Sequence, residues 1–309
     1  MSGRRPARDA VRAVAERLAA AGVDSPGAEA ELLVAHVLGV DRRRLPLADA
    51  PGPDGLRVLD GLVARRVAER VPPQYLTGTA VSGALDLEVG PGVFVPRPET
   101  ELLVADGLAH LPPPRPGGEG PLVVDLCAGS GTLALEFAHA RPDARVHAVE
   151  LHDEALHWLR RNAAARAAAG DTPVTVHAAD ATDPGVLADL RGRADLVVTN
   201  PPYIPVGTPL PPEVGRHEPA TALFGGPDGL DVIRPLAVVA AGLLRPGGRV
   251  VVEHDDTTGE AVAAVFAATG GFGTVERHND LAGRPRYVTA VRTDAPGTRT
   301  RDVEKGSAR

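Results

Sequence analysis

The residues with the clearest chemical potential stand at the end of an apolar run, DLVVTNPPYIP (195–205). There Asn200 is followed at once by Pro201, Pro202 and Tyr203. Proline has no N–H donor and fixes its own φ, so a strand cannot continue through two of them. The pattern therefore predicts a strand that ends at Asn200, with the asparagine held by unusually rigid backbone.

This arrangement suits a reaction at a planar –NH2 group, such as that of an amide or an amino-purine. The nitrogen of such a group is a poor nucleophile because its lone pair is delocalised. The Asn200 side-chain oxygen and the Pro201 carbonyl could accept its two hydrogens, and the Pro-Pro step would fix both acceptors. The lone pair would then face an incoming methyl group while Tyr203 packs against the planar group. We expect Asn200 to position the substrate and not to act as a base. The alternative is an ordinary strand-ending turn, since Asn and Pro are common turn residues.

A second chemical feature, VVDLCAGSGTLALEFA (123–138), lies earlier in the chain. It predicts a glycine-rich turn between a strand and a helix, at the edge of an α/β sheet where ligands bind. Gly129 and Gly131 would let the backbone approach a ligand closely, and the following helix would offer free N–H groups at its start. A glycine turn needed only for helix–strand packing is the alternative.

Two nucleotide cofactors compete for this loop. Gly129, Gly131 and Ala134 fit a dinucleotide fingerprint, and Glu150 follows at the distance where an acid holds ribose hydroxyls. Asp125, however, gives D-x-x-x-G-S-G, which is similar to the S-adenosylmethionine loop of class I methyltransferases. There a carboxylate can face the ammonium of methionine, whereas it would repel a pyrophosphate. The NPPY run also resembles the [N/D]-P-P-[Y/F] signature of methyltransferases that act on planar amino nitrogens, and together the two motifs favour methyl transfer.

Composition limits the other classes of protein. The 309 residues suit one large domain or two smaller ones. The single cysteine, Cys127, excludes an internal disulfide framework and a multi-cysteine zinc site, and we predict no metal site. The sequence contains no apolar run of membrane-spanning length and no signal-peptide pattern at its start, so we expect a cytoplasmic protein without a membrane partner. The net charge of −7 argues against a broad nucleic-acid surface.

The elements that must hold the two motifs begin with a helical region. Apolar residues recur at helical spacing at Val11, Val14 and Leu18, in 27–40 and from about 54 to 70. The segment LDLEVGPGVFV (85–95) then predicts a β-hairpin with Gly90–Gly92 at its turn.

From Leu122 onwards, apolar strand segments alternate with helical patterns. This order predicts a mainly parallel sheet with helices on both faces, because parallel strands need crossover connections. The polar, charged tail from Asp294 predicts disorder. We expect strands within 121–126, 145–151, 173–178, 194–200, 248–254, 273–278 and 286–291.

Four longer blocks resemble those of the HemK/PrmC family, the peptide chain release factor glutamine methyltransferases. They are PQYLTG (73–78), VFVPRPETELLV (93–104), HEPATALFGGPDGLDVIR (217–234) and DLAGRPRYV (280–288), in the family's order. The resemblance runs from about Glu31 to Val291. It implies a Rossmann-like class I methyltransferase fold, with a seven-stranded mainly parallel sheet, a small helical N-terminal domain and a linking β-hairpin. The expected division is a helical substrate-recognition domain (1–78), the hairpin linker (79–96), the methyltransferase domain (97–293) and a disordered tail (294–309).

The resemblance also implies an activity: methylation, from S-adenosylmethionine, of the side-chain amide nitrogen of the glutamine in the Gly-Gly-Gln motif of class 1 release factors. A release factor would be the partner of a monomeric enzyme, with no direct nucleic-acid contact, and 96–100 would close over cofactor and peptide. A nucleic-acid adenine or guanine amino methyltransferase is the alternative, and it would want a basic groove. By motif match, cofactor-binding residues are Asp125, Cys127, Ala128, Gly129, Ser130, Gly131, Glu150, Asp180, Ala181 and Asn200, and substrate-binding residues are Asn200, Pro201, Pro202, Tyr203, Arg97, Pro98 and Glu99.

The chain departs from the family pattern at a few positions. Many relatives have Gly-Thr where this chain has Cys127-Ala128, and aspartate where it has Glu150, although the longer carboxylate can still reach ribose hydroxyls. The run VVVEHDD replaces the usual Glu-x-Gly, and the pattern gives no account of His254. We interpret Cys127 as a packing residue, because no histidine lies near it in sequence, and Trp158 and His217 as structural.

Overall fold

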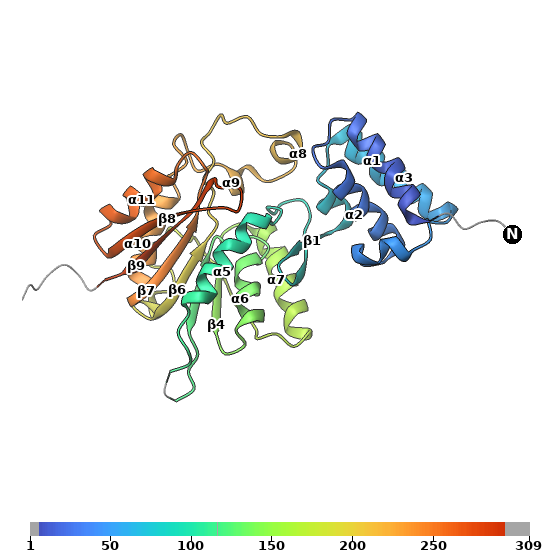
Figure 1. The fold of residues 1–309 in the computed structure, drawn as a ribbon. Helices are drawn as coiled ribbons and strands as arrows, with labels where there is room; N and C mark the ends of the chain where they lie inside the picture. Colours follow the sequence, from blue (N-terminus) through green and yellow to red (C-terminus); the bar gives the residue numbers. More distant parts are fainter. Residues whose placement is uncertain (1–5, 116, 294–309) are drawn as a thin grey trace, which may run out of the picture.

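The computed structural model describes residues 6–115 and 117–293. A helical region lies beside an open α/β sheet, and a short hairpin connects the two (Figure 1). The tail predicted to be disordered, 294–309, lies outside the described residues.

The helical region is built on three long helices whose apolar faces share one core. Val14, Leu18 and Leu33 are fully or almost fully buried in it, as helical spacing predicts. Gly39 closes the second long helix in the left-handed conformation, with φ of 63°, which only glycine adopts without cost. The helices are α1 (Ala7–Ala20), α2 (Pro26–Leu38), η1 (Arg42–Leu47), α3 (Pro53–Glu69) and α4 (Pro73–Thr77).

The linking hairpin is present, but its turn is not where the sequence predicts it. Strands β1 (Thr79–Ser82) and β2 (Leu85–Glu88) pair antiparallel around Gly83, so the prediction of a hairpin with Gly90–Gly92 at its turn is wrong. The chain does turn there, with the Val93 N–H 3.4 Å from the Gly90 carbonyl, but this turn does not join the two strands of the hairpin. Gly90 also serves close packing, because a Cβ there would lie 2.5 Å from the Trp158 ring. A glycine needed for close contact and one needed for a turn look alike in sequence.

The α/β region contains a seven-stranded sheet in the order β5-β4-β3-β6-β7-β9-β8. The first five of these strands are parallel to their neighbours, whereas β9 runs antiparallel between β7 and β8. This confirms the predicted mainly parallel sheet and all seven predicted strand segments. The strands are β3 (Leu122–Leu126), β4 (Arg145–Glu150), β5 (Thr175–Ala178), β6 (Ala194–Thr199), β7 (Leu244–Glu253), β8 (Phe272–Asn279) and β9 (Pro285–Arg292).

Helices cover both faces of the sheet, as alternation along the strands requires. In β6, Val197 faces the core formed with α10 and α11, while Leu196 and Val198 face the core formed with α5, α6 and α7. The helices of this region are η2 (Pro98–Thr100), α5 (Glu101–His110), α6 (Thr132–Ala140), α7 (Asp153–Ala168), η3 (Ala188–Leu190), α8 (Pro212–Gly215), α9 (Ala220–Leu223), α10 (Ile233–Leu243) and α11 (Gly259–Ala268).

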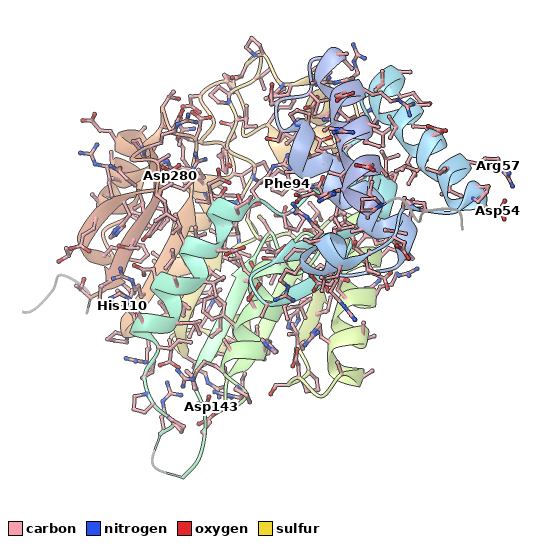
Figure 2. The ribbon with its side chains drawn as sticks, turned by 45° about the vertical axis from the view of Figure 1, so that its right-hand side comes forward. Asp54, Arg57, Phe94, His110, Asp143 and Asp280 are labelled. Atoms are coloured by element: carbon pink, nitrogen blue, oxygen red, sulfur yellow. The ribbon has the colours of Figure 1, made fainter. Side chains whose placement is uncertain are left out.

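The chemically interesting residues gather at one edge of this sheet. Because β3, β4 and β6 are parallel, their carboxyl ends meet there, and the loops that follow them face one another. Figure 2 shows Phe94 near this edge, between the sheet and the helical region, whereas His110 and Asp143 mark the opposite end of the strands.

Candidate active site

The loop after β3 is shaped by residues in the left-handed conformation. Cys127, Gly129 and Gly131 have φ of 63°, 57° and 94°. A side chain at Gly131 would also collide with Leu159, since its Cβ would lie 2.7 Å from that residue. The glycines therefore set the path of the loop into α6, and the non-glycine Cys127 carries local strain.

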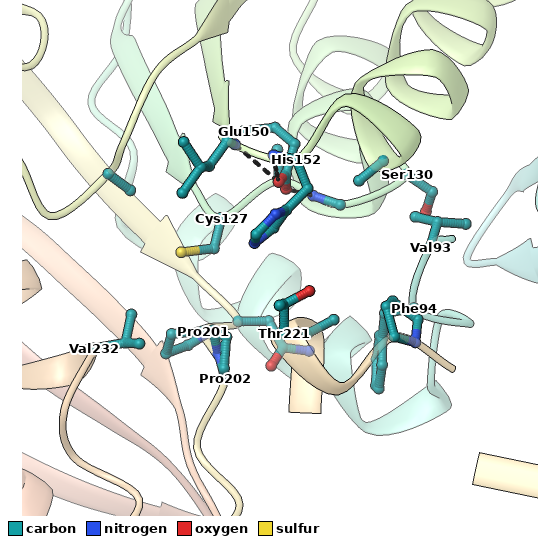
Figure 3. Close-up of a pocket in the computed structure, with 18 of the residues that line it drawn as sticks. Val93, Phe94, Cys127, Ser130, Glu150, His152, Pro201, Pro202, Thr221 and Val232 are labelled. Atoms are coloured by element: carbon teal, nitrogen blue, oxygen red, sulfur yellow. Dashed lines mark hydrogen bonds between the residues drawn. The ribbon is translucent and has the colours of Figure 1, made fainter. Parts of the chain in front are cut away.

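The carboxylate of Glu150 organises the loop from the end of β4. Its Oε2 accepts the Gly129 N–H at 2.9 Å. Its Oε1 accepts the N–H groups of Leu151 and His152 at 2.8 and 2.9 Å. Glu150 is almost fully buried, but these three N–H donors satisfy its oxygens and hold the side chain in one position beside the loop (Figure 3).

Asp125 is buried with one oxygen uncommitted. Its Oδ2 accepts the Ala134 N–H at 3.0 Å, whereas its Oδ1 has no hydrogen-bond partner among the described residues. Complete burial raises the pKa of this carboxyl well above its ordinary value, and the nearby charge of Glu150 raises it further. A buried, half-satisfied carboxylate is costly alone, but a cationic ligand group would satisfy it.

Asn200 stands at the end of β6, as the two prolines predict. The preceding Thr199 fixes this end to β3, because its hydroxyl donates to the Leu126 carbonyl at 2.5 Å. Asn200 Nδ2 donates to Thr100 Oγ1 at 3.4 Å, and the Tyr203 hydroxyl donates to Glu253 Oε1 at 2.9 Å. Burial raises the pKa of Tyr203 well above its ordinary value, so its hydroxyl stays a donor.

The two motifs line one cavity of about 310 Å³, a size that suits a small-molecule ligand. Among the predicted site residues, Gly131, Arg97, Pro98 and Glu99 are not part of its lining. The predicted residues that do line it are Asp125, Cys127, Ala128, Gly129, Ser130, Glu150, Asp180, Ala181, Asn200, Pro201, Pro202 and Tyr203.

Arg97 is engaged elsewhere. Its guanidinium pairs with the buried carboxylate of Glu218 and lies 4.7 Å from the centre of the Phe94 ring. Glu218 Oε2 also accepts the Val95 N–H at 3.2 Å. In this structure Arg97 therefore ties the segment before η2 to the segment that leads into α9.

A similar tie joins the helical region to α8. Arg66, whose side chain is only 1% exposed, donates to Glu29 at 2.7 and 2.9 Å and to Glu213 at 3.3 Å. Arg70 donates to the other oxygen of Glu213 at 2.8 Å. His217 adds a contact of 2.8 Å between its Nε2 and the Glu69 carbonyl, which agrees with a structural role. The wall of the cavity at α9 is thus anchored on both sides.

Some residues of the cavity were missed by sequence reasoning. Figure 3 shows Phe94 and His152 projecting into the cavity, and Thr221 of α9 lies at its wall. Phe94 stands in the block 93–104, which could have pointed to it, whereas Thr100 lies in 96–100, the segment that the resemblance places over the cofactor. His152 carried no signal except its place two residues after Glu150.

The remaining polar residues that the sequence singled out have structural partners. The Trp158 indole donates to the Pro91 carbonyl at 3.2 Å. The buried His254 has its Nδ1 2.7 Å from the Asp255 carbonyl, and burial lowers its pKa. For Cys127, burial together with the charges of Glu150 and Asp125 raises the thiol pKa, so it is no thiolate nucleophile.

Among the residues that the structure describes there is neither a candidate metal cluster nor a membrane-spanning helix. In 6–115 and 117–293, no three His, Cys, Asp or Glu side chains are grouped so that they could hold a metal ion. None of the helices in these ranges combines the length and apolar character needed to cross a membrane.

Comparison with known proteins gives matches along most of the chain. A model of the PrmC N-terminal domain matches residues 9–78, and one of the methyltransferase small domain matches residues 100–208. The release factor glutamine methyltransferase of Mycolicibacterium smegmatis is 53% identical over 285 residues, which cover 92% of this chain and 97% of that protein. The enzyme of the same name from Mycobacterium tuberculosis is 47% identical over 289 residues, 92% and 91% of the two chains. That from Streptomyces coelicolor is 46% identical over 280 residues, 89% and 94% of the two chains.

Proposed function

The chain belongs to the HemK/PrmC family of release factor glutamine methyltransferases, and from this premise we propose that it methylates a glutamine of a class 1 release factor. The acceptor is the side-chain amide nitrogen of the Gly-Gly-Gln motif, and the donor is S-adenosylmethionine. One observation of the structure carries the proposal. Asp125 of the glycine loop and Asn200 of the NPPY turn line the same cavity, although 75 positions separate them in sequence.

The residues of the cavity fit the proposed cofactor. Its methionine portion carries an ammonium group, which the uncommitted Oδ1 of Asp125 would accept. The backbone at Gly129 is open, since a Cβ there would meet no atom within 4 Å. Glu150 and Asp180 bring carboxylates to the cavity lining, where ribose hydroxyls and adenine would need polar partners. S-adenosylmethionine, when bound, supplies a methyl group that is already activated for transfer.

The protein contributes orientation. Asn200 Oδ1 and the Pro201 carbonyl accept the two hydrogens of the glutamine amide, and Tyr203 packs against its plane. This leaves the nitrogen lone pair as the part of the amide that faces the cofactor end of the cavity. The product nitrogen then loses its proton to water, so no side chain has to act as a base.

The finer assignments are part of the same proposal. We assign the cofactor to the loop 125–131 with Glu150, Asp180 and Ala181, and the glutamine to Asn200–Tyr203. For Arg97, Pro98 and Glu99 we propose contact with the release factor outside the cavity, at its rim. The helical region, 1–78, would recognise the factor, 79–96 would link it to the methyltransferase domain at 97–293, and the enzyme would act as a cytoplasmic monomer.

Transfer of labelled methyl groups tests the proposal. The purified protein is incubated with tritiated S-adenosylmethionine and the class 1 release factor of its own organism, beside a factor whose Gly-Gly-Gln glutamine is changed to alanine. We expect label only in the unchanged factor. The variant Asn200→Ala should lower the rate by roughly 10- to 100-fold, because one amide hydrogen loses its acceptor. Label that enters added tRNA, rRNA or DNA and not the factor would overturn the proposal in favour of a nucleic-acid amino methyltransferase.

A further inference from the structure

A buried carboxylate at the end of β7, Glu253, contacts the NPPY turn through the Tyr203 hydroxyl. Glu253 is 1% exposed and lies outside the cavity lining. Its Oε2 accepts the Thr100 hydroxyl at 2.8 Å, and its Oε1 accepts the Tyr203 hydroxyl at 2.9 Å. Desolvation raises the pKa of Glu253, whereas the two hydroxyl donors and the charge of Arg286 oppose that shift. One carboxylate therefore holds side chains from two segments that are distant in sequence.

This contact decides what Thr100 can offer to Asn200. A hydroxyl has one hydrogen, and in this structure Thr100 and Tyr203 each donate theirs to a Glu253 oxygen. Because the Thr100 hydrogen is committed to Glu253, its oxygen faces Asn200 as an acceptor only. Asn200 Nδ2 lies 3.4 Å from that oxygen, a long contact of the kind that tightens when a substrate is bound.

The orientation of the Asn200 carboxamide follows from this chain of donors. Its NH2 end must turn toward Thr100, so its Oδ1 turns away from Thr100 and is free to accept from a substrate. The opposite orientation would present two N–H donors to the –NH2 group of the glutamine, and donor would face donor. Without Glu253, the Thr100 hydroxyl could donate to Asn200 Oδ1 and stabilise that unproductive orientation.

We propose that Glu253, acting through Thr100, is a positioning residue that sets the acceptor orientation of Asn200, while its second oxygen fixes Tyr203 on the other side of the substrate amide. The inference rests on the proposed function, because it concerns how the same site presents its acceptor. Neither Glu253 nor Thr100 needs to exchange a proton with the substrate.

Variants of Thr100 give the sharpest test. Thr100→Val keeps the shape of the side chain but leaves Asn200 Nδ2 against a methyl group in the productive orientation. We expect kcat to fall by about 5- to 100-fold, with the calorimetric Kd for S-adenosylhomocysteine within about twofold of wild type. Thr100→Ser returns the hydroxyl and should recover the rate to within about threefold. As a matched control, Thr289→Val removes a buried hydroxyl of β9 that lies 2.9 Å from His278 of β8 and has no hydrogen bond to Glu253, Thr100 or Asn200 in the described structure, and it should leave kcat unchanged.

A double-mutant cycle separates orientation from packing. Glu253→Gln can donate its amide N–H to Thr100, which frees the Thr100 hydroxyl for Asn200 Oδ1, so kcat should fall to a similar extent. If both residues act through Asn200, the double variant Glu253→Gln/Thr100→Val should be no slower than Thr100→Val alone. Losses that add, or a Thr100→Val variant with kcat within twofold of wild type, would overturn the inference. If wild type transfers no label to the factor, the proposed function itself fails, which is a different outcome.

Discussion

The uncommitted oxygen of Asp125 makes the substitution Asp125→Asn especially informative. Asparagine is nearly isosteric, and its Oδ1 can still accept the Ala134 N–H, which the carboxylate accepts at 3.0 Å. What changes is the other carboxylate oxygen, an acceptor with no partner among the described residues, which the substitution replaces with an NH2 donor. The fold of the loop should therefore survive, while the expected partner of the ligand's ammonium group is lost.

The size of the effect on binding follows from the kind of bond that is lost. A hydrogen bond to a charged group contributes about 1.5–3 kcal/mol, which corresponds to a loss of affinity of about 10- to 150-fold. Titration calorimetry with S-adenosylhomocysteine, which retains the ammonium group, measures it. The control ligand is 5′-methylthioadenosine, which lacks the amino-acid portion and should bind wild type and Asp125→Asn alike. A variant that binds S-adenosylhomocysteine within twofold of wild type would refute the reasoning.

The raised pKa of Asp125 also predicts opposite pH dependences for binding and for stability. Because the pKa of Asp125 is raised, its carboxyl in the ligand-free protein keeps its proton to a higher pH than an ordinary aspartate does. The carboxyl must lose this proton before it can pair with the ammonium group of the ligand. The affinity of wild type for S-adenosylhomocysteine should therefore rise as the pH approaches the raised pKa of Asp125 and level off above it. Between the ordinary and the raised pKa, the folded state binds more protons than the unfolded state, so this group makes the ligand-free protein less stable as pH rises.

Asp125→Asn should abolish both trends at once. Urea unfolding without ligand, measured between pH 5 and 8, should show that the variant is at least as stable as wild type at the upper end of this range. Calorimetry over the same range should show a flatter affinity. A variant that is less stable at every pH, with the pH dependence of wild type, would mean that Asp125 serves loop packing and not a ligand.

Two further predictions concern stability away from the cofactor loop. Gly90→Ala places a Cβ 2.5 Å from the Trp158 ring, and we expect a loss of about 1–3 kcal/mol of unfolding free energy in urea titrations. Glu213→Ala leaves the buried guanidinium of Arg66 with Glu29 alone, and it should cost about 1–3 kcal/mol and loosen α8 from the helical region. Hydrogen exchange at the backbone of 212–223 measures this loosening.

Each of these has a control and a contrary outcome. Gly61→Ala lies in α3, where a Cβ would meet no atom within 4 Å, so it should stabilise the protein by up to about 1 kcal/mol. If Gly90→Ala behaved like Gly61→Ala, the packing interpretation of Gly90 would be wrong. Glu31→Ala removes a carboxylate of an exposed ion pair with Arg42 and should be nearly neutral. Equal effects of Glu31→Ala and Glu213→Ala would mean that the buried ion pairs of Arg66 do not anchor α8.

The sequence by itself determined the parts of the molecule that depend on local constraints. Two prolines end β6 directly before Asn200, wherever the rest of the chain lies, because a strand cannot continue through residues without N–H donors. Apolar strand segments that alternate with helical patterns predicted the seven strands and their mainly parallel direction, since parallel neighbours require crossover helices. Blocks of several residues identified the family, and the comparisons confirmed it.

Only the tertiary structure decided which side chains meet across long separations. Thr100 and Glu253 are 153 positions apart, and no periodicity relates them, yet their contact orients Asn200. Arg97, for which we propose contact with the release factor, pairs with Glu218 across 121 positions, because the segments before η2 and α9 pack together at the cavity. The pattern predicts a turn at Gly90 but not its close approach to the ring of Trp158, which belongs to a distant helix. Local sequence constrains the backbone where it stands, whereas the partner of a side chain depends on how distant segments pack, and that information is distributed over the whole chain.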